Sequence, residues 1–150
     1  MPFPHLAARD LEGRDVVLPE AFDGDRNVVI IAFHRRHQAL VDSWVPWLED
    51  RRVQDPGLCF FELPAIARIW APARPMIDGG MAAAIRDPVV LRRTLTVYGD
   101  VGRLARALRI TSRSTIVLLV VDRAGEVHWS GSGSFSPETA AEMDAALQTL

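Results

Sequence analysis

The segment NVVIIAFHRRHQALVDSWVPWL, from Asn27 to Leu48, carries the strongest fold signal in this 150-residue chain. Its first part, Asn27–Phe33, is apolar and rich in β-branched residues, which is typical of a strand buried on both faces. Its last part is typical of an amphipathic helix that is bent or interrupted at Pro46, with four apolar residues at helical spacing: Leu40, Trp44, Trp47 and Leu48. Two histidines and two arginines therefore fall at a strand–helix junction, where many folds hold functional groups.

The bulk composition is that of a globular chain. Apolar residues make up 49% and charged residues 24%, far from the signature of disorder. The length predicts a single domain over residues 1–150. The net charge of −2 argues against nucleic acid or an anionic membrane as a general partner. All 17 basic residues are arginine, so the chain offers no lysine for nucleophilic or Schiff-base chemistry.

Neither a targeting segment nor a membrane span is visible in the sequence. The first residues lack the basic start and apolar stretch of a signal peptide. The longest apolar runs, Val28–Phe33 and Ile116–Val121, are too short to cross a bilayer. We therefore expect a soluble, cytoplasmic protein. The one cysteine, Cys59, excludes an intramolecular disulfide and a cysteine-based zinc site within one chain.

The rest of the chain alternates strand and helix patterns. We predict a β-hairpin within residues 10–22, buried strands within 57–63 and 92–99, a helix capped by Asp100, a second hairpin over 114–133 and a final helix capped by Ser136. Residues 64–75 are proline-rich and predict an irregular crossing, followed by a turn and a short helix over 76–87. Alternating strands and helices predict a mostly parallel sheet covered on both faces, with the second hairpin at its edge.

Two segments resemble a known superfamily. LEGRDVVLPEAFDGDRNVVIIAF is similar to the start of the peroxiredoxins and the bacterial thiol–disulfide reductases, and ALRITSRSTIVLLVVDRAGEVHWSGSG is similar to their later strand–hairpin segment. The resemblance implies an α/β thioredoxin-like fold with three α/β/α layers. The central mixed sheet would have an N-terminal β-hairpin extension and a C-terminal β-hairpin plus helix. The same hairpin more weakly resembles mitochondrial assembly factors of the ATP synthase membrane sector.

The redox site of those families is missing from this chain. Their chemistry uses a cysteine thiolate at the start of the first long helix, where free amides and the helix dipole lower the thiol pKa. Aligning on Pro46 puts Gln38 and Val41 at the two cysteine positions, and Ser114 where the families place a cis-proline. A cis bond costs a non-proline residue about 2.5–4 kcal/mol, so we do not expect one at Ser114. We accordingly assign no catalytic residue and no cofactor.

Cys59 does not replace the missing cysteines. It lies in the middle of the predicted strand LCFFEL, where a free cysteine usually acts as a small apolar residue with a raised pKa. A one-cysteine peroxidase would need its nucleophile at the strand–helix junction. We therefore expect a structural role for Cys59.

The cluster at the junction allows two functional interpretations. His34 and His37 are three residues apart and could share a metal, but His5 and His128 would have to converge on them to complete a site. Alternatively, the helix start and its basic side chains could bind a carboxylate or phosphate. The plain alternative is a solvated basic face. The candidate ligand-binding set is His34, Arg35, Arg36, His37, Gln38, Ser112 and Ser114.

The tryptophans suggest a surface for protein contacts. We expect either Trp44 or Trp47 in the core, and the other, together with Trp70, at an interaction surface. Large core fillers are the alternative interpretation. Gly79-Gly80 lacks the spacing of a nucleotide-binding loop, so we read it as a loop that permits a sharp helix entry.

Two hypotheses of function follow. The first is a redox-inactive module that binds a protein partner, a small anionic ligand or a second copy of the chain, at the end that carries the active site in the resembling families. The segment WAPARPMIDGGM, residues 70–81, belongs to that surface in this hypothesis. The second is an enzyme, either a divergent peroxiredoxin-like thiol protein or one that uses a metal through His34 and His37.

Overall fold

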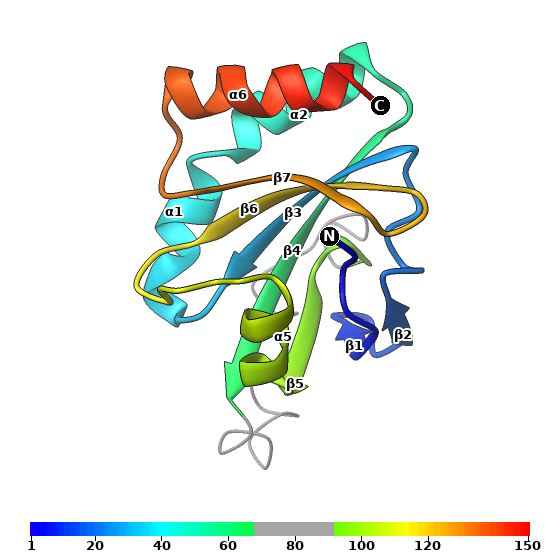
Figure 1. The fold of residues 1–150 in the computed structure, drawn as a ribbon, viewed down its shortest axis with the longest axis vertical. Helices are drawn as coiled ribbons and strands as arrows, with labels where there is room; N and C mark the ends of the chain where they lie inside the picture. The colour runs from blue at the N-terminus through cyan, green and yellow to red at the C-terminus, as the bar shows by residue number, and fades with distance from the viewer. Residues whose placement is uncertain (68–91) are drawn as a thin grey trace.

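The computed structural model describes residues 1–67 and 92–150, which form a mixed β-sheet between two layers of helices (Figure 1). In these residues the strand order is β2-β1-β5-β4-β3-β6-β7. The strands are β1 (Leu6–Asp10), β2 (Asp15–Leu18), β3 (Arg26–Ala32), β4 (Leu58–Ala67), β5 (Leu95–Gly99), β6 (Val117–Asp122) and β7 (Val127–Ser132). The helices are η1 (Arg35–His37), α1 (Gln38–Asp42), α2 (Val45–Gln54), α5 (Val101–Ala107) and α6 (Pro137–Gln148).

The centre of the sheet is parallel and both of its sides are antiparallel. β3 pairs in parallel with β4, and β4 with β5, whereas β6 and β7 extend the sheet antiparallel to β3. The N-terminal hairpin joins the same sheet, because β1 pairs antiparallel with β5. The predicted second hairpin is thus confirmed, whereas the first hairpin begins earlier than predicted, because its first strand, Leu6–Asp10, lies before the expected range. Each hairpin forms one margin of the sheet.

Each face of the sheet has its own apolar core. On one face, α2 and α6 cover the alternate residues of β3 and β6, with Trp44, Leu48 and Met143 fully buried. On the other face, α5 and the N-terminal hairpin cover the opposite set, around Val29 and Leu119. Successive strand residues point to opposite faces, so a central strand covered on both sides must be apolar throughout. This is why NVVIIA was recognisable from its sequence.

Two predictions for the first helix and the proline-rich segment need correction. The helix breaks at Ser43 and Trp44 rather than at Pro46, which lies in the first turn of α2. A proline is tolerated there because that amide has no partner within the helix. Residues 64–67 are not irregular but continue β4, since Ala65 pairs with Val97 and the following residues pair along β5. The rest of 64–75, and 76–87, lie outside the described residues.

The helix caps were predicted in part. Ser136 Oγ accepts a hydrogen bond from the Thr139 amide at 3.1 Å, as expected for an N-cap. Asp100 occupies the N-cap position of α5, but its side chain makes no capping hydrogen bond. Among the described residues, no helix is long and apolar enough to span a bilayer.

Candidate functional site

The strand–helix junction presents an exposed basic segment. After β3 the chain passes through His34, which is extended, into the short η1 turn and then α1. His34, Arg35, Arg36 and Gln38 are exposed. No side chain caps either helix start. Four of the five candidate residues in this segment are therefore accessible.

His37 differs from its neighbours because it is buried, with 1% of its surface exposed. Its Nδ1 accepts a hydrogen bond from the Phe33 amide at 3.1 Å, so the ring must carry its proton on Nε2 when it is neutral. Nε2 then donates to the Ser114 carbonyl oxygen at 3.2 Å. Burial, together with nearby His34 and Arg36, lowers the pKa of His37 despite the Ser114 bond. His37 therefore links the end of β3 to the loop that contains Ser114, a role that we call a clamp, and it is not available to a ligand.

The loop before β6 lies beside the junction because His37 holds it there. Ser112 and Ser114 are exposed, and their hydroxyls are 2.7 Å apart. The Ser114 amide also donates to Ser112 Oγ at 3.2 Å, which fixes the loop in a compact turn. Among the described residues, the one cis peptide bond is Leu18–Pro19, so Ser114 is joined by trans bonds, as expected.

The clamp thus gathers the two predicted segments at one end of the sheet, and we call His34–Gln38 with Ser112–Ser114 the arginine end. Arg35, Arg36 and Arg113 have no ion-pair partner in the part of the chain that the structure describes. Sequence reasoning overlooked Arg113, although it stands between the two chosen serines. A hollow of ≈ 330 Å³ reaches the loop at Ser112. The arginine end can attract anionic groups but holds no nucleophile that resembles a thiolate.

The four histidines do not converge. His34 and His37 rings are 5.0 Å apart between centroids, but both nitrogens of His37 are engaged by the backbone. His5 lies against Glu20, and His128 bonds Asp122 at 2.8 Å. Within residues 1–67 and 92–150, no group of three or more potential ligands is placed to hold a metal ion.

Two of the three tryptophans predicted for an interaction surface, Trp44 and Trp47, lie in the part of the chain that the structure describes. Trp44 is fully buried, and its indole Nε1 donates to the Gly133 carbonyl at 2.9 Å. Trp47 is half-buried, with the Arg51 guanidinium 5.2 Å from its ring centroid. Trp44 is therefore a core residue, not part of a surface. Trp70 and Gly79-Gly80 lie outside the described residues.

Cys59 lies far from the arginine end. It pairs with Asn27 at the beginning of β3, whereas the junction follows Ala32 at the end of that strand. Asn27 and His34 are seven positions apart along an extended chain, which corresponds to roughly 20 Å. Burial, with the nearby Asp23 carboxylate, raises the pKa of the Cys59 thiol. A raised pKa leaves little thiolate near neutral pH.

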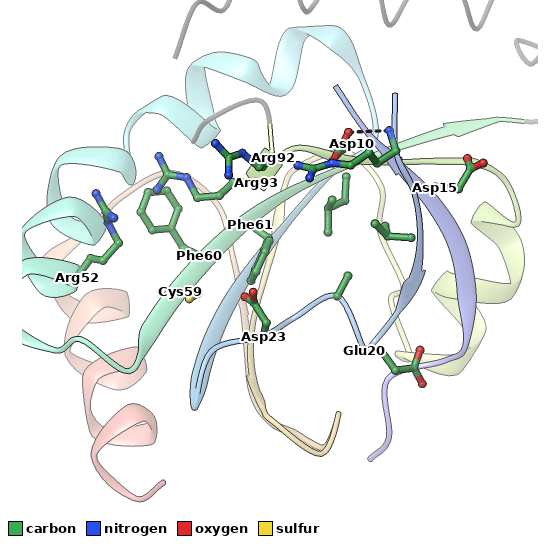
Figure 2. A pocket seen from close by; sticks show the side chains of 14 residues that line it. Asp10, Asp15, Glu20, Asp23, Arg52, Cys59, Phe60, Phe61, Arg92 and Arg93 are labelled. Carbon is green, nitrogen blue, oxygen red and sulfur yellow. Dashed lines mark hydrogen bonds and ion pairs between the residues drawn. The ribbon is translucent and has the colours of Figure 1, made fainter. Parts of the chain in front are cut away.

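The second candidate region is a cavity of ≈ 580 Å³ between the N-terminal hairpin and β4, and Cys59 is one of the residues that line it (Figure 2). Its lining includes Phe60 and Phe61, with Arg52, Arg92 and Arg93 along one side and Asp23 and Glu20 on another. These residues come from separate elements, and none belongs to a motif. Periodicity and spacing therefore gave no signal for this region.

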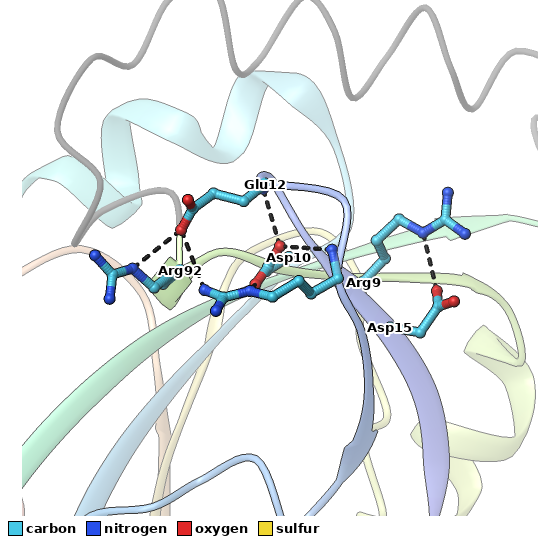
Figure 3. Close-up of polar contacts among 6 residues, drawn as sticks. Arg9, Asp10, Glu12, Asp15 and Arg92 are labelled. Atoms are coloured by element: carbon cyan, nitrogen blue, oxygen red, sulfur yellow. Dashed lines mark hydrogen bonds and ion pairs between the residues drawn. The ribbon is translucent and has the colours of Figure 1, made fainter.

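The hairpin wall of this cavity is held by a network of charges (Figure 3). The buried Asp10 carboxylate accepts from the Glu12 and Arg14 amides at 2.9 and 3.0 Å, and from Arg14 Nε at 3.0 Å. Glu12 in turn accepts from Arg14 at 3.1 Å and from Arg92 at 3.0 Å. Two acids and two arginines are thus joined in one network along this wall.

The architecture is that of the thioredoxin-like proteins, as the resemblance predicted. No family model matches the sequence, and comparison with curated proteins gives no match.

Solved structures show the likeness. Arabidopsis thaliana ScoI with copper bound is similar with a TM-score of 0.67 at 7% identity, over 100% of both chains. A putative thiol:disulfide interchange protein DsbE from Chlorobium tepidum is similar with a TM-score of 0.57 at 15% identity, over 97% of this chain and 95% of that one. An uncharacterised protein from Geobacillus kaustophilus reaches 0.65 at 16% identity, over 100% of this chain and 80% of that one. At these identities the likeness shows the fold alone.

Proposed function

We propose that this chain is a cytoplasmic thioredoxin-like binding module that carries out no thiol–disulfide chemistry and binds an acidic surface of a partner protein at its arginine end. The partner, its specific role and the redox inactivity all belong to this proposal. It is the same end that the first hypothesis from the sequence selected.

The observation that carries the proposal is the separation of the sulfur from the junction. The families that this chain resembles carry reactive cysteines at the start of the first helix. This chain has Gln38 and Val41 at the aligned positions. Cys59, the one cysteine of the chain, lies at the opposite end of β3 and β4, with a raised pKa. Thiol chemistry needs a thiolate at the cleft, and the described arrangement supports none there.

The charge of the arginine end favours an acidic partner. Most arginines elsewhere in the described residues are paired with carboxylates, whereas Arg35, Arg36 and Arg113 are not. Unpaired, exposed arginines speed the encounter with an oppositely charged surface and pair well with carboxylates. The fold also occurs in BsSco, a protein with a disulfide switch that is described as a member of the Sco family of cytochrome c oxidase assembly proteins. That description supports a binding role for such a scaffold by analogy only.

Charge reversal tests the proposal. Tagged wild type should retain specific partner proteins from extracts of its own cells, and Arg35→Glu/Arg36→Glu should lose them. A matched control is Arg103→Glu/Arg106→Glu, which makes the same charge change at two exposed positions of α5. If both double variants lose the same proteins, the binding is a non-specific effect of net charge. If neither does, the arginine end is not the interface.

The enzyme alternatives have less support. A metal site through His34 and His37 would require His37 Nδ1 to give up the hydrogen bond from the Phe33 amide, and binding through Nε2 would cost the Ser114 bond as well. A peroxiredoxin-like reaction would have to use Cys59 from a partly buried position. Copper stoichiometry after loading, measured by elemental analysis, separates the metal alternative from the binding module, which we expect to retain none after dialysis.

A further inference from the structure

In the part of the chain that the structure describes, the cavity beside Cys59 lies where β4 and β5 are not yet paired. β4 pairs with β3 from Leu58 onward, but its ladder with β5 begins at Ala65, preceded by a single bridge between Glu62 and Thr94. Among the described residues, no strand fills the space between the start of β4 and the N-terminal hairpin (Figure 2). The resulting volume of ≈ 580 Å³ lies within the range of small-molecule sites, about 300–1,000 Å³.

The lining of the cavity is mainly apolar. Phe60, Phe61 and Leu95 are buried core residues that also reach the cavity, and further apolar lining comes from Val16, Ala21 and Cys59. Aromatic side chains supply large, rigid surfaces against which an apolar ligand can pack. The lining therefore suits a molecule with an aromatic or aliphatic body.

Positive charge is in excess at one side of this apolar lining. Arg52 and Arg93 share a single carboxylate, Glu49, at 2.8 and 3.3 Å. The Arg93 guanidinium lies 4.1 Å above the centroid of the Phe60 ring. Its Nε and Nη1 are buried without a hydrogen-bond partner. Buried donors without acceptors are unfavourable, so Arg93 is incompletely satisfied by the protein.

Other acids of the cavity lie away from these two arginines, with Glu20 and Asp23 on another side of the lining. Glu62, which is on the same face of β4 as Phe60, is half-buried, and burial raises its pKa although Arg93 opposes that shift. On the hairpin wall, Asp10 and Glu12 are already engaged by Arg14 and Arg92. The unpartnered donors of Arg93 thus remain beside Phe60, where the aromatic lining begins.

We propose that this cavity binds a small organic acid, with its carboxylate at Arg52 and Arg93 and its apolar body against Phe60, Phe61 and Leu95. The ligand carboxylate gives the two guanidinium groups a second acceptor, and the aromatic lining is covered. This site is separate from the arginine end, since it lies at the start of β4 and the arginine end follows the end of the parallel strand β3. It goes beyond the proposed function, and either can fail without the other.

Cys59 makes the proposal directly measurable, because it lines the cavity and is the sole cysteine. Its alkylation rate by iodoacetamide reports cavity occupancy without a label, and isothermal titration calorimetry measures binding independently. The probes are phenylacetate, its alcohol phenethyl alcohol and its amine phenethylamine, which have similar bodies and different charges. We expect phenylacetate to slow alkylation and to bind at least about tenfold more tightly than the alcohol, and the amine to bind more weakly still.

Variants of the two arginines test whether the ligand carboxylate binds at Arg52 and Arg93. Arg52→Gln should weaken phenylacetate binding about tenfold and leave the alcohol unchanged, while the exposed Arg103→Gln on α5 should alter neither. Arg93→Gln should have the larger effect, and Arg52→Gln keeps the test valid if the Arg93 variant does not fold. Equal binding of acid and alcohol, or no effect of Arg52→Gln, would overturn the proposal. So would the absence of both a calorimetric signal and Cys59 protection with folded wild type.

Discussion

The two ends of the parallel strands β3 and β4 use arginine in different ways. At the arginine end, Arg35, Arg36 and Arg113 are exposed and have no ion-pair partner among the described residues. At the cavity, Arg52 and Arg93 crowd around one acid beside an aromatic lining. Exposed charge suits recognition of another protein, whereas charge beside an apolar hollow suits a small molecule. The comparison teaches that the two ends of the same strands can present arginine in environments suited to different kinds of ligand.

The largest expected effect concerns what holds the arginine end in shape. His37→Ala should lower the free energy of unfolding by about 2–4 kcal/mol, because it leaves the buried Phe33 amide without an acceptor and opens a cavity. The matched control is His34→Ala, at an exposed neighbouring position, which should stay within about 0.5 kcal/mol of wild type. Urea unfolding followed by tryptophan fluorescence measures both. Similar values for the two variants would show that His37 is not a clamp.

The second comparison is between a satisfied and an unsatisfied arginine. Arg26 Nε donates to Asp55 at 2.8 Å in a two-point ion pair, and this pairing lowers the pKa of Asp55. Arg26→Met should therefore cost about 1–2 kcal/mol. Arg93→Met should cost less than Arg26→Met, since the lost ion pair with Glu49 is longer, at 3.3 Å, and two buried donors without a partner are removed with it. Equal losses in urea unfolding would mean that Arg93 is fully satisfied in solution.

A smaller effect should appear with pH. Above the ordinary histidine pKa of 6.5, His37 is neutral in the folded and unfolded chain. Its folded pKa is lowered, so the unfolded chain takes up the proton first as the pH falls, and the free energy of unfolding decreases until the folded pKa is passed. Asp55 and Asp122 have lowered pKa values and lose their contributions only at more acid pH.

Urea midpoints between about pH 7.5 and about pH 5.5 check this prediction. Wild type should lose stability across that interval, and His37→Gln, which cannot titrate there, should lose less. A slope that is the same in both proteins would assign the pH dependence to other groups.

The smallest expected effect on stability is at the proposed interface itself. Arg35→Glu/Arg36→Glu should change the free energy of unfolding by less than about 0.5 kcal/mol, because both side chains are exposed and unpaired. Circular dichroism melting of this variant beside wild type makes the measurement. A clear loss of stability would mean that the two arginines serve the fold, and any loss of partner binding would then need another explanation.

The elements with strong periodicity could be predicted from the sequence. The apolar run of β3 and the Ser136 cap of α6 depend on local patterns, so they were recognisable without the structure. The extension of β4 past Pro64 was not, because it depends on pairing with β5, which lies far along the chain. Tertiary pairing overrode the local proline signal in this segment.

The candidate sites divide in the same way. The basic junction was visible because its residues are consecutive, but the burial of His37 was not, since it depends on the Ser114 carbonyl 77 residues away. The cavity gave no signal because Arg52, Phe60 and Arg93 come from different elements. Residues that come together only in the folded chain have no characteristic spacing in the sequence, so no motif identifies them.

The most direct test of the binding-module account is a thiol-chemistry assay of the purified chain. Reduction of insulin disulfides and dithiothreitol-dependent removal of hydrogen peroxide should both proceed at the rate of the protein-free control, for wild type and for Cys59→Ser alike. Turnover by wild type that disappears in Cys59→Ser would contradict the account and make the protein a thiol enzyme.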